Sequence, residues 1–388
     1  MKTSIYFAKL SEEIKFLKLE HLYRELRQLD EIRETTAKIE NREVILFCSN
    51  DYLGLSKHPL VIKAFQKAAE EFGVGAGASR LISGTSKIAS ELEQRIAGFK
   101  EKERALVFTT GYLANLGIIS AFCGEKDVVI VDKLNHASIV DACKLSGARI
   151  RVYPHKDLNY LEKILKQCGR FQKKLIVTDS VFSMDGDLAP LKEIAELKNR
   201  YGAYLMIDEA HGTGIFGKKG TGAAEFLGVQ NEVDISMGTL SKAIGTLGGF
   251  VAADGELVDY LINKSRTFIF ATALPPAILA ASTKSLELIQ KDSLLRGTLW
   301  ARIDQLRKGL EKIGIPIPKD ASPIIPVIVG EEKRAKEVSD SLLREGFLIP
   351  AVRYPTVPKG KARLRITLSA LHKESDVQKL LTVLSRTL

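Results

Sequence analysis

The chain has 388 residues, of which 45% are hydrophobic and 27% are charged. This length and composition exclude disordered and fibrous proteins, and they predict two or three globular domains that need no disulfide or structural metal. A net charge of +10 raises the question of nucleic acid, but the basic stretches are short and no zinc-finger spacing or RNA-binding signature accompanies them. We therefore expect neither a nucleic-acid partner nor a bound metal.

The cellular compartment is indicated by the cysteines and by the N-terminal segment. No C-x-x-C pair occurs among the cysteines, which is typical of a reducing compartment; they are Cys48, Cys123, Cys143 and Cys168. The first 29 residues are too charged for a secretory leader and predict an amphipathic helix. Residues 105–124 carry no formal charge, but their Gly, Asn, Ser and Thr favour a buried segment over a membrane span. A cytoplasmic protein with no membrane segment is expected.

In chain order, residues 1–50 are predicted to form a helical arm and a short strand, EVILFCS, followed by a large domain over 51–285. From about residue 100 to 255, short β-rich runs alternate with helical stretches such as 136–146, 157–168 and 190–201. The predicted strands are 105–109, 127–131, 149–153, 174–179, 203–208, 233–238 and 248–253. Strands of Val, Ile and Leu separated by helices indicate an α/β domain with a mainly parallel sheet, which binds ligands beyond the carboxyl ends of its strands.

The pattern changes after Pro275-Pro276, where a long helical stretch is predicted over residues 277–313. Strands follow in IIPVIVG, FLIPAV and ARLRITLSA, with helices at 331–345 and 373–388. We assign residues 286–388 to a smaller α+β domain.

The motif DEAHGTG, residues 208–214, lies where a predicted strand ends, and Lys242 follows another strand in GTLSKAIG. A carboxylate, an imidazole and a lysine in such loops are what a pyridoxal phosphate site requires. The lysine forms a Schiff base, and the carboxylate keeps the pyridine nitrogen protonated. Taken alone, Asp208 could be a helix cap, His211 a core histidine and Lys242 a surface lysine. Their joint position favours the cofactor site.

The sequence resembles the α-oxoamine synthases, fold-type-I pyridoxal phosphate enzymes that condense an amino acid with an acyl-CoA. The resemblance runs from about Leu22 to the C-terminus. It is carried, in order, by SNDYLGL, GTS, TTGYLAN, NHAS, VFSMDGD, DEAHGTG, GTLSKAIG and PTVPKGKARLRITLSA. It implies a homodimer with amino-acid and acyl-CoA substrates. Many members carry a histidine where this chain has Ala89, so no role is assigned to that position.

The resemblance also assigns catalytic roles. Lys242 would bind the cofactor covalently and take the α-proton of the amino acid. Asp208 would pair with the pyridine nitrogen, and His211 with the ring hydroxyl. His136 of NHAS would stack on the ring, while Asn135 is expected to cap the helix that starts there.

Further cofactor-binding residues come from three motifs. In TTGYLAN, Gly111 allows close approach of the backbone, and it starts a predicted helix whose first N–H groups face an anion. Tyr112 follows it and is included in the site. The resemblance adds Thr239 for the phosphate and Ser183 of VFSMDGD beside the ring hydroxyl.

Most of the predicted substrate-binding residues are arginines, because the planar guanidinium group binds both oxygens of a carboxylate. The resemblance gives Arg365 to the amino-acid carboxylate and places a further arginine in the N-terminal segment, where Arg27 remains an alternative to Arg24. The complete predicted set is Arg24, Asn50, Arg353, Thr356 and Arg365.

Two substrate pairs remain open within the family. ALPPA at 273–277 and VRYPTVP at 352–358 favour L-alanine with pimeloyl-CoA or pimeloyl carrier protein, because Arg353 could pair with the terminal carboxylate of pimelate. The alternative is glycine with acetyl-CoA. Outside this chemistry, the alternatives are another pyridoxal phosphate reaction, such as transamination or β-elimination, and a basic binding protein with a degenerate site.

Overall fold

The computed structural model describes residues 2–388, without the side chains of residues 2–6, and the chain divides into two units. Unit 1 comprises the described residues up to Ser49, together with Met184–Gly186 and Thr298–Leu388. Unit 2 comprises Asn50–Ser183 and Asp187–Gly297. The three-part division predicted from the sequence stays a prediction.

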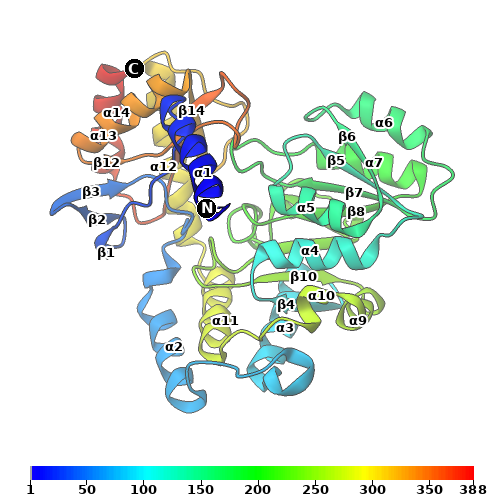
Figure 1. Ribbon diagram of the computed structural model, residues 1–388. Helices are drawn as coiled ribbons and strands as arrows, with labels where there is room; N and C mark the ends of the chain where they lie inside the picture. The colour runs from blue at the N-terminus through cyan, green and yellow to red at the C-terminus, as the bar shows by residue number, and fades with distance from the viewer. Residues whose placement is uncertain (1) are drawn as a thin grey trace. The chain divides into compact units, whose positions relative to one another are not determined.

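Unit 2 contains a seven-stranded sheet in the order β4-β10-β9-β8-β7-β5-β6 (Figure 1). The strands are β4 (Arg104–Phe108), β5 (Val128–Asp132), β6 (Arg149–Tyr153), β7 (Lys174–Asp179), β8 (Tyr204–Asp208), β9 (Ile235–Thr239) and β10 (Gly249–Ala253). β10 runs antiparallel to β4 and β9, and the pairs among β9, β8, β7, β5 and β6 are parallel. All seven strands predicted from the sequence are present, and the prediction of a mainly parallel sheet is confirmed.

Helices surround this sheet, and α4 and α5 cover one of its faces. The α-helices of unit 2 are α2 (Pro59–Phe72), α3 (Lys87–Lys100), α4 (Gly111–Phe122), α5 (Ala137–Ser146), α6 (Leu158–Lys166), α7 (Leu191–Tyr201), α8 (Ala223–Phe226), α9 (Gly255–Lys264), α10 (Arg266–Ile269) and α11 (Pro276–Lys291). Ile118 of α4 and Ile139 of α5 pack with alternate strand residues such as Val129 and Val131. The uncharged segment 105–124 thus consists mainly of β4 and α4, and all of its residues except Tyr112 are buried or partly buried.

The long helical stretch predicted over 277–313 is two helices, because the chain breaks at Asp292 and Ser293. The first is α11 and the second is α12 (Leu294–Lys312). Asp292 has an extended backbone, and its Oδ1 accepts a hydrogen bond of 2.7 Å from the Leu294 N–H. An aspartate that binds the first N–H groups of a helix in this way starts a new helix, so the continuous prediction was wrong here.

Unit 1 contains two sheets, one in the order β1-β2-β3-β12 and one in the order β11-β14-β13. The strands are β1 (Asp30–Arg33), β2 (Thr36–Ile39), β3 (Arg42–Leu46), β11 (Ile324–Gly330), β12 (Phe347–Leu348), β13 (Ala351–Val352) and β14 (Ala362–Thr367). FLIPAV, predicted as one strand, leaves the first sheet after Leu348 and enters the second at Ala351, because Pro350 between them has no N–H to donate.

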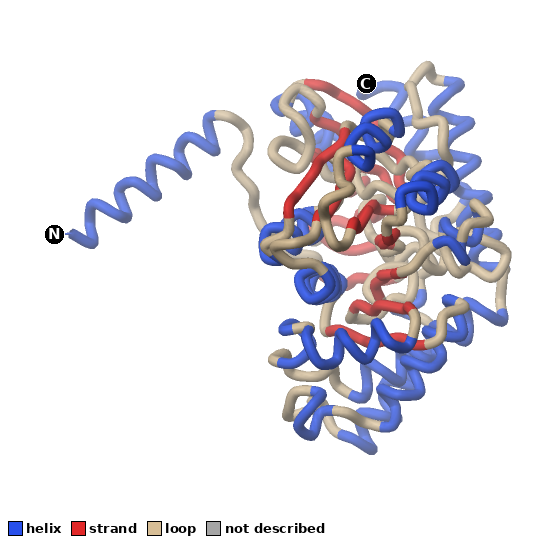
Figure 2. Tube along the Cα trace, turned by 90° about the vertical axis from the view of Figure 1, so that its right-hand side faces the viewer, coloured by secondary structure: helices blue, strands red, loops and turns tan. Residues whose placement is uncertain are grey.

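Three further helices belong to unit 1: α1 (Lys2–Leu19), α13 (Glu332–Arg344) and α14 (Glu374–Thr387). The last two match the helices predicted at 331–345 and 373–388. α1 extends away from the strands of its unit (Figure 2), and Phe7, Phe16 and Leu19 on it are exposed.

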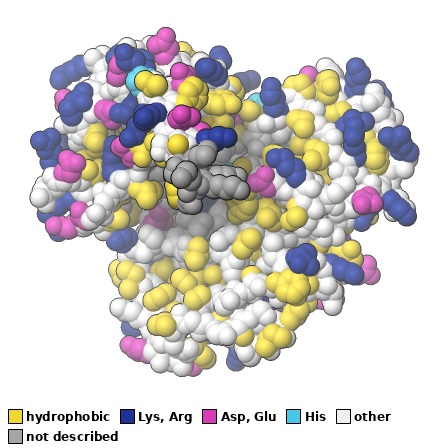
Figure 3. Space-filling model, viewed as in Figure 1, with side chains coloured by type: hydrophobic (Ala, Val, Ile, Leu, Met, Phe, Trp, Pro, Cys, Tyr) yellow, Lys and Arg dark blue, Asp and Glu magenta, His cyan; other side chains and the backbone are white. Residues whose placement is uncertain are grey.

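The distribution of surface charge and the apolar character of the helices are relevant to binding of nucleic acid and of membranes. Lys and Arg side chains are interspersed with acidic and hydrophobic side chains on the face drawn in Figure 3. Among the helices described in residues 2–388, none combines the length and apolar character required to cross a membrane.

Candidate functional site

A pocket of about 230 Å³ lies in unit 2 at the carboxyl ends of β7, β8 and β9. This is the edge at which parallel α/β sheets bind ligands. All of the residues predicted to contact the cofactor line it: Gly111, Tyr112, His136, Ser183, Asp208, His211, Thr239 and Lys242. Residues more than 130 positions apart in the chain are therefore brought together as the motifs predict.

Lys242 is held beside His211 in this pocket. The Lys242 Nζ lies 2.9 Å from His211 Nε2, and His211 Nδ1 lies 2.7 Å from the hydroxyl of the buried Tyr52. The Tyr52 hydroxyl in turn donates to Asn50 Oδ1 at 3.2 Å. Sequence reasoning missed Tyr52, because a tyrosine next to Leu53 and Leu55 resembles an ordinary core residue. The sequence signal that could have found Tyr52 was its position two residues after Asn50, a predicted substrate-binding residue.

Asp208 is the last residue of β8 and is buried in the pocket wall. One carboxylate oxygen accepts a 2.8 Å hydrogen bond from Asn115 Nδ2, and the other accepts a 2.9 Å bond from the Ala210 N–H. Each oxygen has a second lone pair, so the carboxylate can accept a further donor. Asn115 was not predicted, although it lies one helical turn after Gly111 on α4.

His136 caps α5 through its side chain, which corrects the expected role of Asn135. The Ser138 N–H donates to His136 Nδ1 at 3.3 Å, whereas the Asn135 amide bonds to Val177 O and to the Asp179 N–H. Burial is the main reason why the pKa of His136 is lowered, despite the nearby Asp208 carboxylate. The ring is therefore neutral at pH 7.

Asp179 places a second carboxylate in the pocket, opposite Asp208 in the register of β7 and β8. It is buried, and its Oδ2 accepts a 2.8 Å hydrogen bond from the His136 N–H. Burial and the Asp208 charge raise its pKa well above the ordinary value. The sequence offered one signal for Asp179, since it ends a strand as Asp208 does.

The anion-binding end of the pocket is formed by the start of α4 and the end of β9. A Cβ atom on Gly111 would lie 3.3 Å from Thr239 Cβ, so a larger residue would crowd this end. Thr239 Oγ1 lies 2.8 Å from the hydroxyl of Ser241, which was not predicted. A helix N-terminus with two hydroxyls nearby suits a phosphate.

These residues fit the chemical groups of pyridoxal phosphate. Lys242 offers an amine for the aldehyde, and Asp208 a carboxylate for the pyridine nitrogen. His211 and Ser183 offer polar groups for the ring hydroxyl, and α4 begins beside a place for the phosphate.

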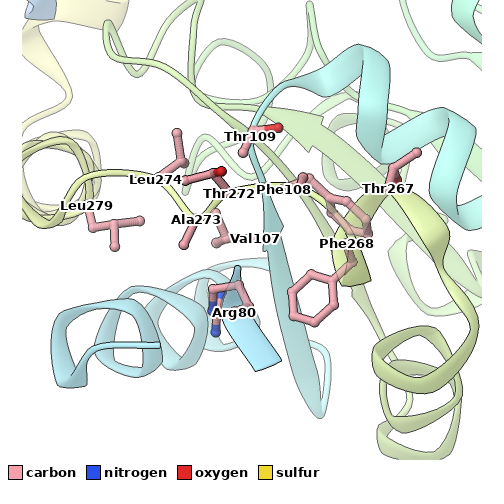
Figure 4. A pocket seen from close by; sticks show the side chains of 11 residues that line it. Arg80, Val107, Phe108, Thr109, Thr267, Phe268, Thr272, Ala273, Leu274 and Leu279 are labelled. Atoms are coloured by element: carbon pink, nitrogen blue, oxygen red, sulfur yellow. The ribbon is translucent and has the colours of Figure 1, made fainter. Parts of the chain in front are cut away.

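A second pocket, shown in Figure 4, encloses only about 10 Å³. Its arginine, Arg80, forms a two-pronged ion pair with Glu93 at 2.8 and 3.0 Å and also donates to Thr85. The guanidinium carbon lies 5.4 Å from the centroid of the Phe268 ring. These contacts hold Arg80 in the wall of a small, mainly apolar pocket.

Three of the predicted substrate-binding residues lie together in unit 1. Arg24 Nη2 donates to Thr356 Oγ1 at 3.4 Å, and Arg353 donates to the carbonyl oxygens of His21 and Tyr23. Burial lowers the pKa of Arg353, and the Arg24 charge acts in the same direction. The two arginines thus form a local concentration of positive charge.

The other two predicted substrate-binding residues lie elsewhere. Arg365 is buried in β14, and Asn50 belongs to unit 2, where it accepts the hydrogen bond from Tyr52. Burial raises the pKa of Cys48 to about 11, and the charges of Arg365 and Arg27 oppose this rise. Arg27 is therefore near Cys48, as Arg365 is, whereas Arg24 lies with Arg353.

Known proteins share this fold and much of this sequence. The family model described as aminotransferase class I and II matches residues 42–384. The chain belongs to this family. It is 47% identical to the 8-amino-7-oxononanoate synthase of Geobacter sulfurreducens, over 97% of each chain. It is 39% identical to 8-amino-7-oxononanoate synthase 1 of Bacillus subtilis, over 98% of this chain and 97% of that one.

A solved serine palmitoyltransferase from S. paucimobilis, with bound PLP and myriocin, has a TM-score of 0.94 and 33% identity to this chain. The match covers 98% of this chain and 97% of that one. The predicted resemblance, the fold-type-I architecture, the pyridoxal phosphate cofactor and the acyltransferase class are confirmed. The alternative of a binding protein with a degenerate site is not supported.

Proposed function

We propose that this enzyme catalyses the decarboxylating condensation of L-alanine with pimeloyl-CoA, or with pimeloyl carrier protein. The products would be 8-amino-7-oxononanoate, carbon dioxide and the free thiol, in biotin biosynthesis. The observation that carries this proposal is the pocket, which gathers every predicted cofactor residue around Lys242, in a chain similar throughout to relatives named for that product.

The pocket residues supply the proton transfers that the reaction needs. When bound, pyridoxal phosphate withdraws electrons from the α-carbon of the amino acid. We propose that the Lys242 Nζ binds the cofactor and later takes the α-proton, since His211 Nε2 at 2.9 Å orients the amine. Asp208 would keep a proton on the pyridine nitrogen, and the neutral ring of His136 would cover the face of the cofactor.

The bonds made and broken balance for these substrates. A C–C bond forms between the α-carbon of alanine and the thioester carbonyl carbon, and the C–S bond breaks, so that the sulfur leaves as a thiolate and takes a proton from water. The bond from the α-carbon to the alanine carboxylate then breaks and releases carbon dioxide. A proton returned by Lys242 takes its place on the α-carbon.

The residues of unit 1 support the choice of acyl donor. We propose that Arg353, with Arg24 and Thr356, binds the terminal carboxylate of the pimeloyl chain, because two cations at one place suit an anionic group. Arg365 would bind the amino-acid carboxylate, and Asn50 would contact the substrate. Glycine with acetyl-CoA is less favoured, since an acetyl group has no second carboxylate for Arg353.

Thiol release is the measurement that tests this proposal, with L-alanine and glycine each combined with pimeloyl-CoA and acetyl-CoA. We expect the highest kcat/KM for L-alanine with pimeloyl-CoA. The Arg353→Gln variant should raise the KM for pimeloyl-CoA roughly tenfold and leave the KM for alanine unchanged, because one charged partner is lost. Arg386→Gln, an exposed arginine of α14, is the matched control.

Two results would overturn the proposed substrates. A higher kcat/KM for glycine with acetyl-CoA would replace them with the alternative pair. Absence of thiol release with every pair, in protein that holds the cofactor, would instead indicate another reaction such as transamination.

We also propose that the enzyme is a homodimer. Both units expose large apolar side chains, among them Leu19 of α1 and Ile82 and Phe270 of unit 2. A bridge between Ser79 and Thr272 brings the segments that carry Ile82 and Phe270 close together. Light scattering should give twice the chain mass, and Ile82→Glu should lower that mass; a monomeric wild-type protein would contradict the proposal.

A further inference from the structure

His155 lies between two aspartates just outside the pocket. It follows β6 in the sequence YPHKD. His155 Nδ1 is 3.0 Å from Asp132 Oδ1, and His155 Nε2 is 2.9 Å from Asp187 Oδ2. All three residues belong to unit 2, and none of them lines the pocket.

Asp132 holds the loop that leads to His136. It is the buried last residue of β5, and its Oδ1 also accepts a 2.8 Å hydrogen bond from the Leu134 N–H. Its Oδ2 accepts a 2.9 Å bond from the Lys156 N–H. The chain then reaches His136 two residues after Leu134, so the position of Asp132 fixes where this loop enters the pocket.

Asp187 closes the loop that carries Ser183. Its carbonyl oxygen accepts a 3.0 Å hydrogen bond from the Phe182 N–H. The Phe182 ring meets the His155 ring edge to face, with 4.4 Å between centroids and 89° between planes. Because Ser183 is the next residue, His155 contacts both ends of the loop that positions this hydroxyl.

The two hydrogen bonds require a charged ring. Both ring nitrogens face carboxylates, and only the imidazolium form donates from both. Lys156 is the other cation at this site, with its Nζ 3.1 Å from Asp187 Oδ2. Burial works against the charge on His155, but the hydrogen bonds and charges of Asp132 and Asp187 outweigh it and raise the pKa to about 9.

We propose that His155 is a positioning residue for the cofactor: its imidazolium joins Asp132 to Asp187 and so fixes the His136 loop against the Ser183 loop. The proposal rests on the pyridoxal phosphate site and not on the identity of either substrate. His155 does not touch the reacting atoms, so its effect should appear first in cofactor affinity.

The pH dependence follows from the raised pKa. A histidine in the unfolded chain titrates near its ordinary pKa of roughly 6.5. The contribution of the bridge to folding stability is fully present below that value; in the folded protein the bridge itself persists until the pH rises through about 9. The affinity for pyridoxal phosphate should therefore contain a component that disappears over this upper range.

Equilibrium dialysis of pyridoxal phosphate against cofactor-free, full-length protein tests the proposal. Gln cannot place donors on both carboxylates and carries no charge, so we expect His155→Gln to weaken binding roughly tenfold near neutral pH. The ratio of the variant and wild-type dissociation constants should fall toward one as the pH passes about 9, because the wild-type protein then loses the same bridge.

Lys173→Gln is the matched control. Lys173 Nζ pairs with Asp127 Oδ2 at 3.3 Å, and Asp127 directly precedes β5, at the end of the strand opposite Asp132. Loss of this pair perturbs the same strand away from the pocket, and cofactor affinity should stay at the wild-type level. Asp187→Asn is a second test variant. It should also weaken the binding of pyridoxal phosphate, but by less than His155→Gln.

Three results would overturn the proposal. They are wild-type cofactor affinity in both test variants, equal weakening in Lys173→Gln, or a variant to wild-type ratio that does not change with pH. If His155→Gln does not fold, Asp187→Asn decides the question by the same comparison.

Discussion

Replacement of Lys242 by alanine is expected to abolish covalent attachment of the cofactor and to lower kcat by at least roughly a thousandfold. The Lys242 amine is 2.9 Å from His211 Nε2 in the pocket, so its removal leaves His211 without the group that it orients. The visible absorbance of the bound cofactor should change. Borohydride reduction followed by mass spectrometry should show no modified residue in the variant.

Lys264→Ala is the control for this experiment. Lys264 is an exposed lysine at the end of α9, and its loss should change neither kcat nor the reduced adduct. A Lys242→Ala protein in which reduction still links the cofactor to a lysine would show that the central assignment is wrong.

Substitution of Asp208 by asparagine should give the second largest effect, a loss of kcat of about a hundredfold or more. The amide has nearly the same size as the carboxylate, and its oxygen can still accept the Ala210 N–H bond of 2.9 Å. It carries no negative charge to keep a pyridine nitrogen protonated. We therefore expect the absorbance of the bound cofactor to shift, while the folded structure is retained.

Asp234→Asn is the control, because it tests whether the loss of any carboxylate next to a strand lowers kcat in the same way. Asp234 directly precedes β9, at the opposite end of the sheet, and accepts hydrogen bonds from Leu205 N–H at 2.6 Å and Lys198 Nζ at 3.0 Å. Its substitution should affect stability more than kcat. Similar kcat values for the two variants would contradict the assigned role of Asp208.

The sequence was sufficient to predict the large sheet and most of the pocket. Runs such as DVVIV and KLIVTD are short, apolar and β-branched, and buried parallel strands require this composition. Their carboxyl ends meet at one edge, so polar residues that directly follow them fall together. Asp208 and Lys242 were therefore predictable from position and chemistry, and the other motifs completed the set.

The remaining site residues depend on contacts between distant parts of the chain. Tyr52 meets His211 across 159 positions, and Asn115 meets Asp208 across 93. Neither periodicity nor spacing specifies such pairs. The same holds for His155, whose role depends on two aspartates from separate loops.

Single residues also interrupt some elements that the sequence pattern predicts to be continuous. Asp292 starts a new helix within an apparently continuous helical stretch, and Pro350 separates two strands within one β-rich run. The hairpin of β1 and β2 was not predicted, because its charged residues lack the apolar alternation of a half-buried strand.

The most direct test of the proposed function is the fate of the alanine carboxylate. Holoenzyme is mixed with pimeloyl-CoA and L-alanine labelled in its carboxyl carbon, and released thiol and labelled carbon dioxide are counted together. A decarboxylating condensation predicts equal amounts of the two. Thiol release with the label retained in an amino-acid product, or labelled carbon dioxide without thiol release, would contradict it.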